Sequence, residues 1–151
     1  MKQDHIFRQV GEFNLEAGGK LADFQLKYTT LGRLNKDRTN AVWVIHALTG
    51  NSDVTSWWPG LFEEDSPYDP KDHFIICANT LGGCYGSTGP LSINSNSGKP
   101  FYHDFPPLTN RDIVRAFDLL RIELGLEKIH TVIGSSLGGQ QALEWQVLCV
   151  G

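Results

Sequence analysis

Residues 129–145 read IHTVIGSSLGGQQALEW, and this stretch decides the fold that we predict. A short run of β-branched and apolar residues, typical of a buried strand, leads into a Gly-rich turn, and helix-forming residues follow. Within the stretch, Gly134, Ser136 and Gly138 match the pattern G-x-S-x-G. In this context the pattern is typical of a serine raised above the end of a sheet on a sharp strand-to-helix turn. We therefore predict that Ser136 is a catalytic nucleophile.

The chemistry of such a turn explains its glycines. A Cβ at the flanking positions would crowd the neighbouring backbone. The next helix directs its first N–H groups toward a developing oxyanion, so the backbone N–H of Leu137 is one expected donor. The alternative is a plain Gly-rich turn without a catalytic role. A phosphate-binding loop is disfavoured because neither the G-K-[ST] ending nor G-x-G-x-x-G occurs.

A second oxyanion donor is expected in the loop after an earlier strand. The segment HALTG, residues 46–50, directly follows the apolar run AVWVI, so we predict that the N–H of Leu48 is this donor. His46 is a candidate for the catalytic base. However, the fold class that uses this elbow supplies its acid and its histidine after the serine in the chain, and His46 lies far before it. We interpret His46 as a hydrogen-bonded structural histidine at a strand end.

Three further segments predict a sheet. Residues 24–31 alternate apolar and polar side chains, which is typical of a half-buried strand near a sheet edge. Residues 41–48 and 73–79 are nearly continuous apolar runs, typical of strands covered on both faces, as in a parallel sheet. With a helix between strands, they form strand–helix–strand units with right-handed crossovers. We expect an α/β fold with a mostly parallel sheet and helices on both faces.

That helix is predicted for residues 109–124. Its apolar residues recur at three- and four-residue spacing and would form one buried face. Thr109 followed by Asp112 resembles a capping box at the start, and Gly125 suits the left-handed residue that follows a helix. Local signals therefore predict both ends of the helix.

Residues 82–107 are irregular for their whole length and rich in Gly and Pro. A loop of this length is uncommon in a compact domain unless it serves a site. It directly follows a predicted strand, and ligands of open α/β sheets bind beyond the carboxyl ends of the strands. We expect the loop to border the site; the alternative is a surface excursion without a ligand.

The composition predicts a globular protein. Hydrophobic residues make up 40% of the 151 residues, and a net charge of −4 gives no reason to expect nucleic acid or an anionic membrane as a partner. The N-terminus lacks the apolar core of a signal peptide and no apolar run is long enough to span a membrane, so we expect a soluble cytoplasmic protein. Cys77, Cys84 and Cys149 lack paired spacing and are interpreted as free thiols, with no metal site.

Several stretches together resemble one family within the α/β-hydrolase fold, the homoserine O-acyltransferases of methionine biosynthesis, most often homoserine O-acetyltransferases. The stretches are KYTTLGRLN, HALTGNSDV, WWPGLF, FIICANTLGGCYGSTGPLSIN and FPPLTNRDIVRAFDLLRIELGLEKIHTVIGSSLGGQQALEW, and they cover nearly the whole chain. LGGCYGSTGP after a strand is much more specific than the serine motif. The resemblance implies that residues 1–151 are the N-terminal part of a single α/β-hydrolase domain, truncated after the nucleophile helix, without its later strands and helical lid.

The resemblance also implies a ping-pong acyl transfer. Acetyl-CoA would acylate Ser136, and the γ-hydroxyl of L-homoserine would then accept the acetyl group. The backbones of Leu48 and Leu137 correspond to the oxyanion-hole positions. No separate cofactor is implied, and the full-length protein would be a homodimer. The residues implied to bind substrate are Thr49, Gly82 and Gly83.

Two features depart from the family pattern. The family commonly reads Gly-Ser-Met where this chain has Ser135, Ser136 and Leu137. Leu for Met is a mild change because only the backbone N–H is required, whereas Ser135 adds a side chain beside the elbow. The family places its catalytic Asp, its catalytic His and a substrate-binding Arg after the serine, but no Asp, His or Arg follows Ser136 here. We therefore expect these 151 residues alone to be inactive.

Two alternatives stay open. One is a serine esterase or thioesterase, which shares the elbow but passes the acyl group to water; the stretch LGGCYGSTGP argues against it. The other is a non-catalytic fragment that binds a complementary half. The sequence does not decide between an acetyl and a succinyl donor, or between homoserine and serine as the acceptor.

Overall fold

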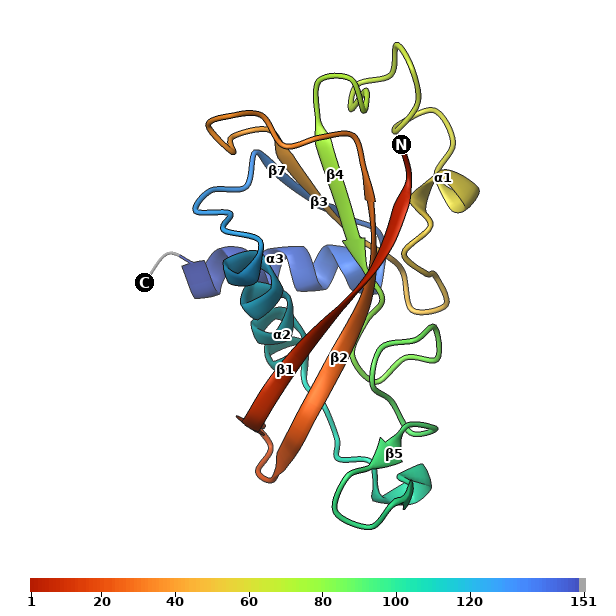
Figure 1. The fold of residues 1–151 in the computed structure, drawn as a ribbon, viewed down its shortest axis with the longest axis vertical. Coiled ribbons are helices and arrows are strands. Elements are labelled where there is room, and N and C mark those ends of the chain that lie inside the picture. The colour runs from red at the N-terminus through yellow and green to blue at the C-terminus, as the bar shows by residue number, and fades with distance from the viewer. Residues whose placement is uncertain (150–151) are drawn as a thin grey trace.

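A computed structural model of the chain describes residues 1–149, with side chains for residues 1–148. Its centre is a five-stranded sheet in the order β1-β2-β4-β3-β7 (Figure 1). The strands are β1 (Gln3–Asn14), β2 (Lys20–Leu31), β3 (Ala41–Ile45), β4 (Phe74–Ala78) and β7 (Thr131–Gly134). The parallel arrangement is confirmed for β4, β3 and β7, whereas β2 pairs antiparallel with both β1 and β4. The sheet as a whole is therefore mixed.

β1 is a long edge strand that the sequence analysis did not predict. It pairs with β2 in a hairpin, and a β-bulge between Val10 and Phe13 interrupts the register. Gly11, inside the bulge, has a φ of +97°. The bulge breaks the two-residue alternation by which a half-buried strand is identified, and most β1 side chains are exposed. This is why the strand was missed.

The helices cover both faces of the sheet, as predicted. α2 (Asn110–Glu123) and α3 (Leu137–Cys149) lie on one face, where Phe117 and Trp145 pack against Trp43 of β3. The short helix α1 (Val54–Trp57) and the aromatic residues after it cover the opposite face, over Val42 and Ile75. Among the described residues, no helix is both long and apolar enough to cross a membrane.

The predicted ends of α2 are confirmed. The Thr109 hydroxyl accepts a hydrogen bond from the Asp112 N–H, and the Asp112 carboxylate accepts one from the Thr109 N–H, which completes a capping box. At the other end Gly125 has a φ of +64°, and its N–H donates to the carbonyl of Ile122. The helix is therefore defined by local interactions at both ends.

The long segment after β4 is mostly irregular but not entirely. It contains a small antiparallel pair, β5 (Ile93–Asn94) with β6 (Lys99–Pro100), and a 3₁₀ turn η1 (Tyr102–Asp104). The start of the segment is fastened to β2, because the Thr88 N–H donates to Gln25 O and the Gln25 N–H donates to the Thr88 hydroxyl. These contacts hold the loop beside the carboxyl end of β4.

Candidate active site

Ser136 occupies the turn between β7 and α3 and has a φ of +52°. The glycines on either side are required by close approach. A Cβ on Gly134 would lie 2.2 Å from the carbonyl oxygen of Gly138, and a Cβ on Gly138 would lie 2.2 Å from the carbonyl oxygen of Ile45. No side chain fits at such distances, so the strand–turn–helix elbow predicted from G-x-S-x-G is present.

The backbone of Ser136 is held while its side chain is left free. Its carbonyl accepts hydrogen bonds from the N–H groups of Gly139 at 3.0 Å and Gln140 at 3.2 Å. The side chain is exposed, and its hydroxyl makes no hydrogen bond with any residue that the structure describes. In particular, no carboxylate or imidazole of residues 1–148 is bonded to it. The described residues therefore present a free hydroxyl without a base.

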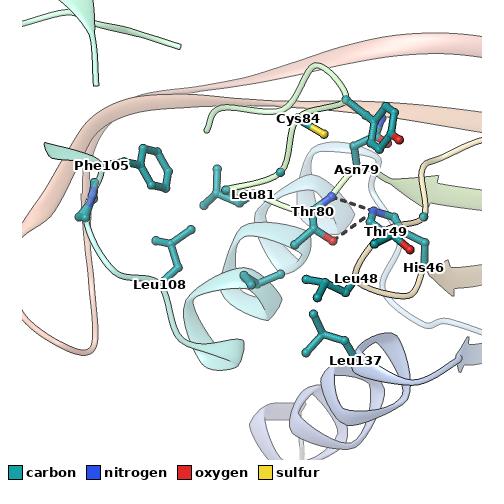
Figure 2. A pocket seen from close by; sticks show the side chains of 16 residues that line it. His46, Leu48, Thr49, Asn79, Thr80, Leu81, Cys84, Phe105, Leu108 and Leu137 are labelled. Carbon is teal, nitrogen blue, oxygen red and sulfur yellow. Dashed lines mark hydrogen bonds between the residues drawn. The ribbon is translucent and has the colours of Figure 1, made fainter. Parts of the chain in front are cut away.

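A pocket of about 430 Å³ opens next to the elbow (Figure 2). Three parts of the chain line it: the turn after β3, the loop after β4, and the approach to α2 together with Leu137. Among the predicted site residues, Leu48, Thr49, Gly82, Gly83 and Leu137 all belong to the lining. Ser136 does not, but it directly precedes Leu137. The structure thus brings together residues that the sequence separates by almost ninety positions.

The pocket is apolar and uncharged in the described part of the chain. Its walls are formed largely by Leu48, Leu81, Phe105, Leu108 and Leu137, and no Asp, Glu, Lys or Arg lines it. In addition, no group of three or more potential metal ligands occurs among the described residues. Apolar walls lower the local dielectric constant and so strengthen any electrostatic interaction made within the pocket.

The two predicted oxyanion donors have backbone N–H groups that are not used elsewhere. Among the described residues, neither the Leu48 N–H nor the Leu137 N–H donates to an acceptor. For Leu137 the reason is its place as the first residue of α3, because the first N–H groups of a helix have no carbonyl a turn earlier to bond. Both residues line the same pocket, and Leu137 directly follows Ser136 in the chain.

His46 is buried, with 4% of its surface exposed, and hydrogen-bonded through both ring nitrogens. Nδ1 lies 2.6 Å from Ala47 O, and Nε2 accepts a hydrogen bond from the Thr80 N–H at 3.1 Å (Figure 2). Burial lowers the pKa of His46 below its ordinary value of 6.5, against the opposing effect of the Ala47 carbonyl. These contacts confirm that His46 is a buried, hydrogen-bonded histidine directly after β3.

Asn79, which the sequence analysis did not single out, holds the loops around the pocket. Its side chain accepts a hydrogen bond from the Ser52 N–H at 2.8 Å and donates one to Lys27 O at 3.1 Å. Its backbone carbonyl accepts a hydrogen bond from the Ser87 hydroxyl. The Ser52 hydroxyl is also 2.7 Å from that of Thr29. A polar residue at the end of a buried apolar strand is the signal that could have identified Asn79.

The chain is similar in sequence to known proteins over most of its length. A family described as alpha/beta hydrolase fold matches residues 40–146. A homoserine O-acetyltransferase of Cyclobacterium marinum is 59% identical over 142 residues, which are 94% of this chain and 40% of the relative. One from Chlorobaculum parvum is 52% identical over 92% of this chain and 39% of its own length. The chain thus spans about 40% of the length of these curated relatives.

Solved structures of two kinds of protein resemble the fold. The crystal structure of homoserine O-acetyltransferase from Bacillus anthracis superposes with a TM-score of 0.90 at 29% identity, covering 97% of this chain and 43% of that one. An acetylester hydrolase from Corynebacterium glutamicum gives a TM-score of 0.83 at 33% identity, covering 97% of this chain and 40% of that one. The architecture is therefore similar to that of both transferases and esterases.

Proposed function

The chain belongs to the alpha/beta hydrolase fold family, and from that premise we propose that it is part of a homoserine O-acetyltransferase of methionine biosynthesis. The enzyme would transfer an acetyl group from acetyl-CoA to L-homoserine through an acylated Ser136. The main observation is the elbow at Ser136, which directly precedes an apolar pocket lined by Leu48 and Leu137, the two residues whose N–H groups have no acceptor among the described residues. The similarity to named homoserine O-acetyltransferases supports the choice of substrates.

In the first half-reaction, a base would remove the proton from Ser136 Oγ, which attacks the thioester carbonyl carbon of acetyl-CoA. The negative charge that develops on the carbonyl oxygen would be stabilised by the N–H groups of Leu48 and Leu137. Collapse of this intermediate breaks the C–S bond, and CoA leaves as the thiol after it takes up the proton. In the second half, the γ-hydroxyl of homoserine attacks the carbonyl carbon of the acyl-serine, and the base takes the proton of that hydroxyl. The bond between the acyl carbon and Ser136 Oγ then breaks, and the base passes the proton to Ser136 Oγ.

Other residues would support these steps. Thr49, Gly82 and Gly83 line the pocket and would contact substrate, while the apolar walls would keep water from hydrolysing the acyl-enzyme. No Asp or His follows Ser136 within the 151 residues, so the acid and the histidine of the triad would come from the rest of a longer protein. The polypeptide of residues 1–151 alone would then show negligible acyl transfer.

The remaining features of the proposal are what the resemblance to homoserine O-acetyltransferases implies. Acetyl-CoA would act as a substrate, and no separate cofactor or metal would be needed. The full-length enzyme would be a cytoplasmic homodimer with small-molecule partners, acetyl-CoA and L-homoserine. Nucleic acid would not be a partner, which agrees with the net charge of −4.

The first prediction concerns Ser136 in the full-length protein. Ser136→Ala removes the nucleophile and should lower kcat for CoA release in the presence of homoserine by about 10⁶-fold. Ser135→Ala is the matched control, because the Ser135 hydroxyl makes no hydrogen bond among the described residues, and it should stay active. Turnover that persists in Ser136→Ala would refute the proposed nucleophile.

A second candidate is an esterase or thioesterase, favoured by the similarity to the acetylester hydrolase structure. The same assay discriminates the two, because a transferase forms O-acetylhomoserine, whereas an esterase forms acetate regardless of homoserine. If the protein forms neither product and a fluorophosphonate probe does not label Ser136, the protein would instead be non-catalytic.

A further inference from the structure

We infer that His46 is a positioning residue that fixes the direction of the Leu48 N–H by holding the opposite side of the same peptide group. The inference rests on the proposed function, because it assumes that the Leu48 N–H receives the oxyanion. It gives the buried histidine after β3 a role in the reaction, although His46 makes no hydrogen bond with the Ser136 hydroxyl and, by this proposal, does not touch the reacting atoms.

One peptide group joins Ala47 to Leu48 and carries both the carbonyl and the N–H in question. The carbonyl of Ala47 and the N–H of Leu48 belong to one planar trans group and therefore point in opposite directions. Two donors hold the carbonyl: Nδ1 of His46 at 2.6 Å and the N–H of Gly50 at 2.8 Å. A rotation of this peptide group would break both bonds. The N–H of Leu48 is thereby directed away from the turn and stays without an acceptor among the described residues.

The tautomer of His46 follows from its other neighbour. The Thr80 N–H donates to Nε2 at 3.1 Å, and a backbone N–H can only donate, so Nε2 carries no proton. In a neutral imidazole the single proton is then on Nδ1, where it is donated to Ala47 O. The loop after β4 thus selects the form of the ring that can hold the turn after β3.

The ring and the turn are also matched in shape. A Cβ on Gly50 would lie 2.9 Å from Cβ and 3.3 Å from Cγ of His46, so only glycine lets the turn close over the imidazole. The backbone of His46 in turn lies against the nucleophile helix, because a Cβ on Gly138 would be 2.8 Å from His46 O. One residue therefore contacts the oxyanion turn, the pocket wall and the elbow.

Two replacements in the full-length protein separate positioning from packing. The amide of Asn reaches the position of Nδ1 and can donate to Ala47 O, whereas the amide of Gln reaches the position of Nε2. His46→Asn should keep kcat within several-fold of the wild type. His46→Gln should lower kcat about 100-fold with little change in KM, since loss of one oxyanion donor costs about that much.

A purely structural histidine gives a different pattern. Asn and Gln would then both lower thermal stability, but the folded fraction of each would turn over at the wild-type rate. The inference is overturned if His46→Gln keeps its kcat, if His46→Asn loses as much as His46→Gln, or if the change is in KM alone.

A measurement that needs no activity tests the tautomer directly. In the ¹⁵N-histidine NMR spectrum of the full-length protein near neutral pH, the signals lost in His46→Asn should show a protonated Nδ1 and an unprotonated Nε2. A proton on Nε2 would overturn the inference whatever the enzyme does. If His46 has the expected tautomer but the protein catalyses neither acyl transfer nor ester hydrolysis, the proposed function is refuted. The positioning role of His46 is then refuted with it. An active enzyme with the wrong tautomer refutes the inference alone.

Discussion

At the scale of the residue, the elbow combines strain with close packing. Ser136 adopts a left-handed φ of +52°, which costs an L-residue about 1 kcal/mol or more. The conformation persists because the backbones of Gly134, Gly138 and Ile45 meet at distances that leave no space for a side chain. Strained non-glycine residues of this kind are concentrated at functional sites, where the surrounding structure holds them.

Gly138→Ala tests this packing. The added Cβ would lie 2.2 Å from Ile45 O, so β3 and α3 must separate, and the free energy of unfolding should fall by about 3 kcal/mol. Gly139→Ala is the matched control, because its Cβ meets nothing closer than 3.4 Å. Alanine is also favoured over glycine inside a helix, by about 0.5–1 kcal/mol, so this variant should be as stable as the wild type or more so. Urea denaturation measures both; equal stabilities would contradict the close approach.

At the scale of the element, features that depend on neighbouring residues could be predicted from the sequence, whereas features that depend on contacts between distant segments could not. α2 was predicted with both ends because its capping box and Gly125 lie within the helix and its first flanking residues. β1 was missed because a bulge interrupts its alternation, and its identity as a strand depends on pairing with β2. Asn79 was missed for a related reason, since its partners come from segments up to 52 residues away.

The outer edge of β7 supports a prediction about association. No strand among the described residues pairs with that edge, and α3 beside it exposes Leu143 and Val147, at 66% and 67%. Unpaired strand edges next to apolar surface favour self-association. We expect the polypeptide of residues 1–151 to form oligomers as its concentration rises, as measured by light scattering over a dilution series.

The control for this prediction changes only exposed side chains. Leu143→Glu with Val147→Glu adds like charges one helical turn apart on the exposed face of α3 and should shift the polypeptide toward the monomer. If the wild-type polypeptide stays monomeric over the whole dilution series, the outer edge of β7 does not cause self-association.

At the scale of the whole molecule, the site follows from the direction of the strands. β4, β3 and β7 are parallel, so their carboxyl ends meet at one edge of the sheet, and each is followed by a segment that borders the pocket. This convergence could be predicted from the sequence because continuous apolar runs identify buried parallel strands. The contacts that set the loop positions, such as the hydrogen bond from the Thr80 N–H to His46, could not, because they depend on register across the sheet.

The burial of His46 makes the free energy of unfolding depend on pH. Burial lowers the pKa of His46 in the folded protein below 6.5, so between the two pKa values the unfolded chain binds more protons. The stability from the neutral ring is therefore complete above about pH 6.5 and is lost as the pH falls through the lower folded pKa. The slope cannot exceed about 1.4 kcal/mol per pH unit for one proton. Asp53 and Asp69, whose pKa values are lowered by hydrogen bonds, act in a separate window below 3.8.

Urea denaturation at several pH values between about 7.5 and 5 tests this dependence. The wild type should lose stability toward acid, and His46→Asn should flatten the curve, because the group that must stay neutral is gone. His103→Asn, a change at an exposed histidine, should keep the wild-type slope. If His46→Asn kept that slope as well, protonation of His46 would not cause the pH dependence of stability. The stability data would then give no evidence that His46 is neutral when it holds Ala47.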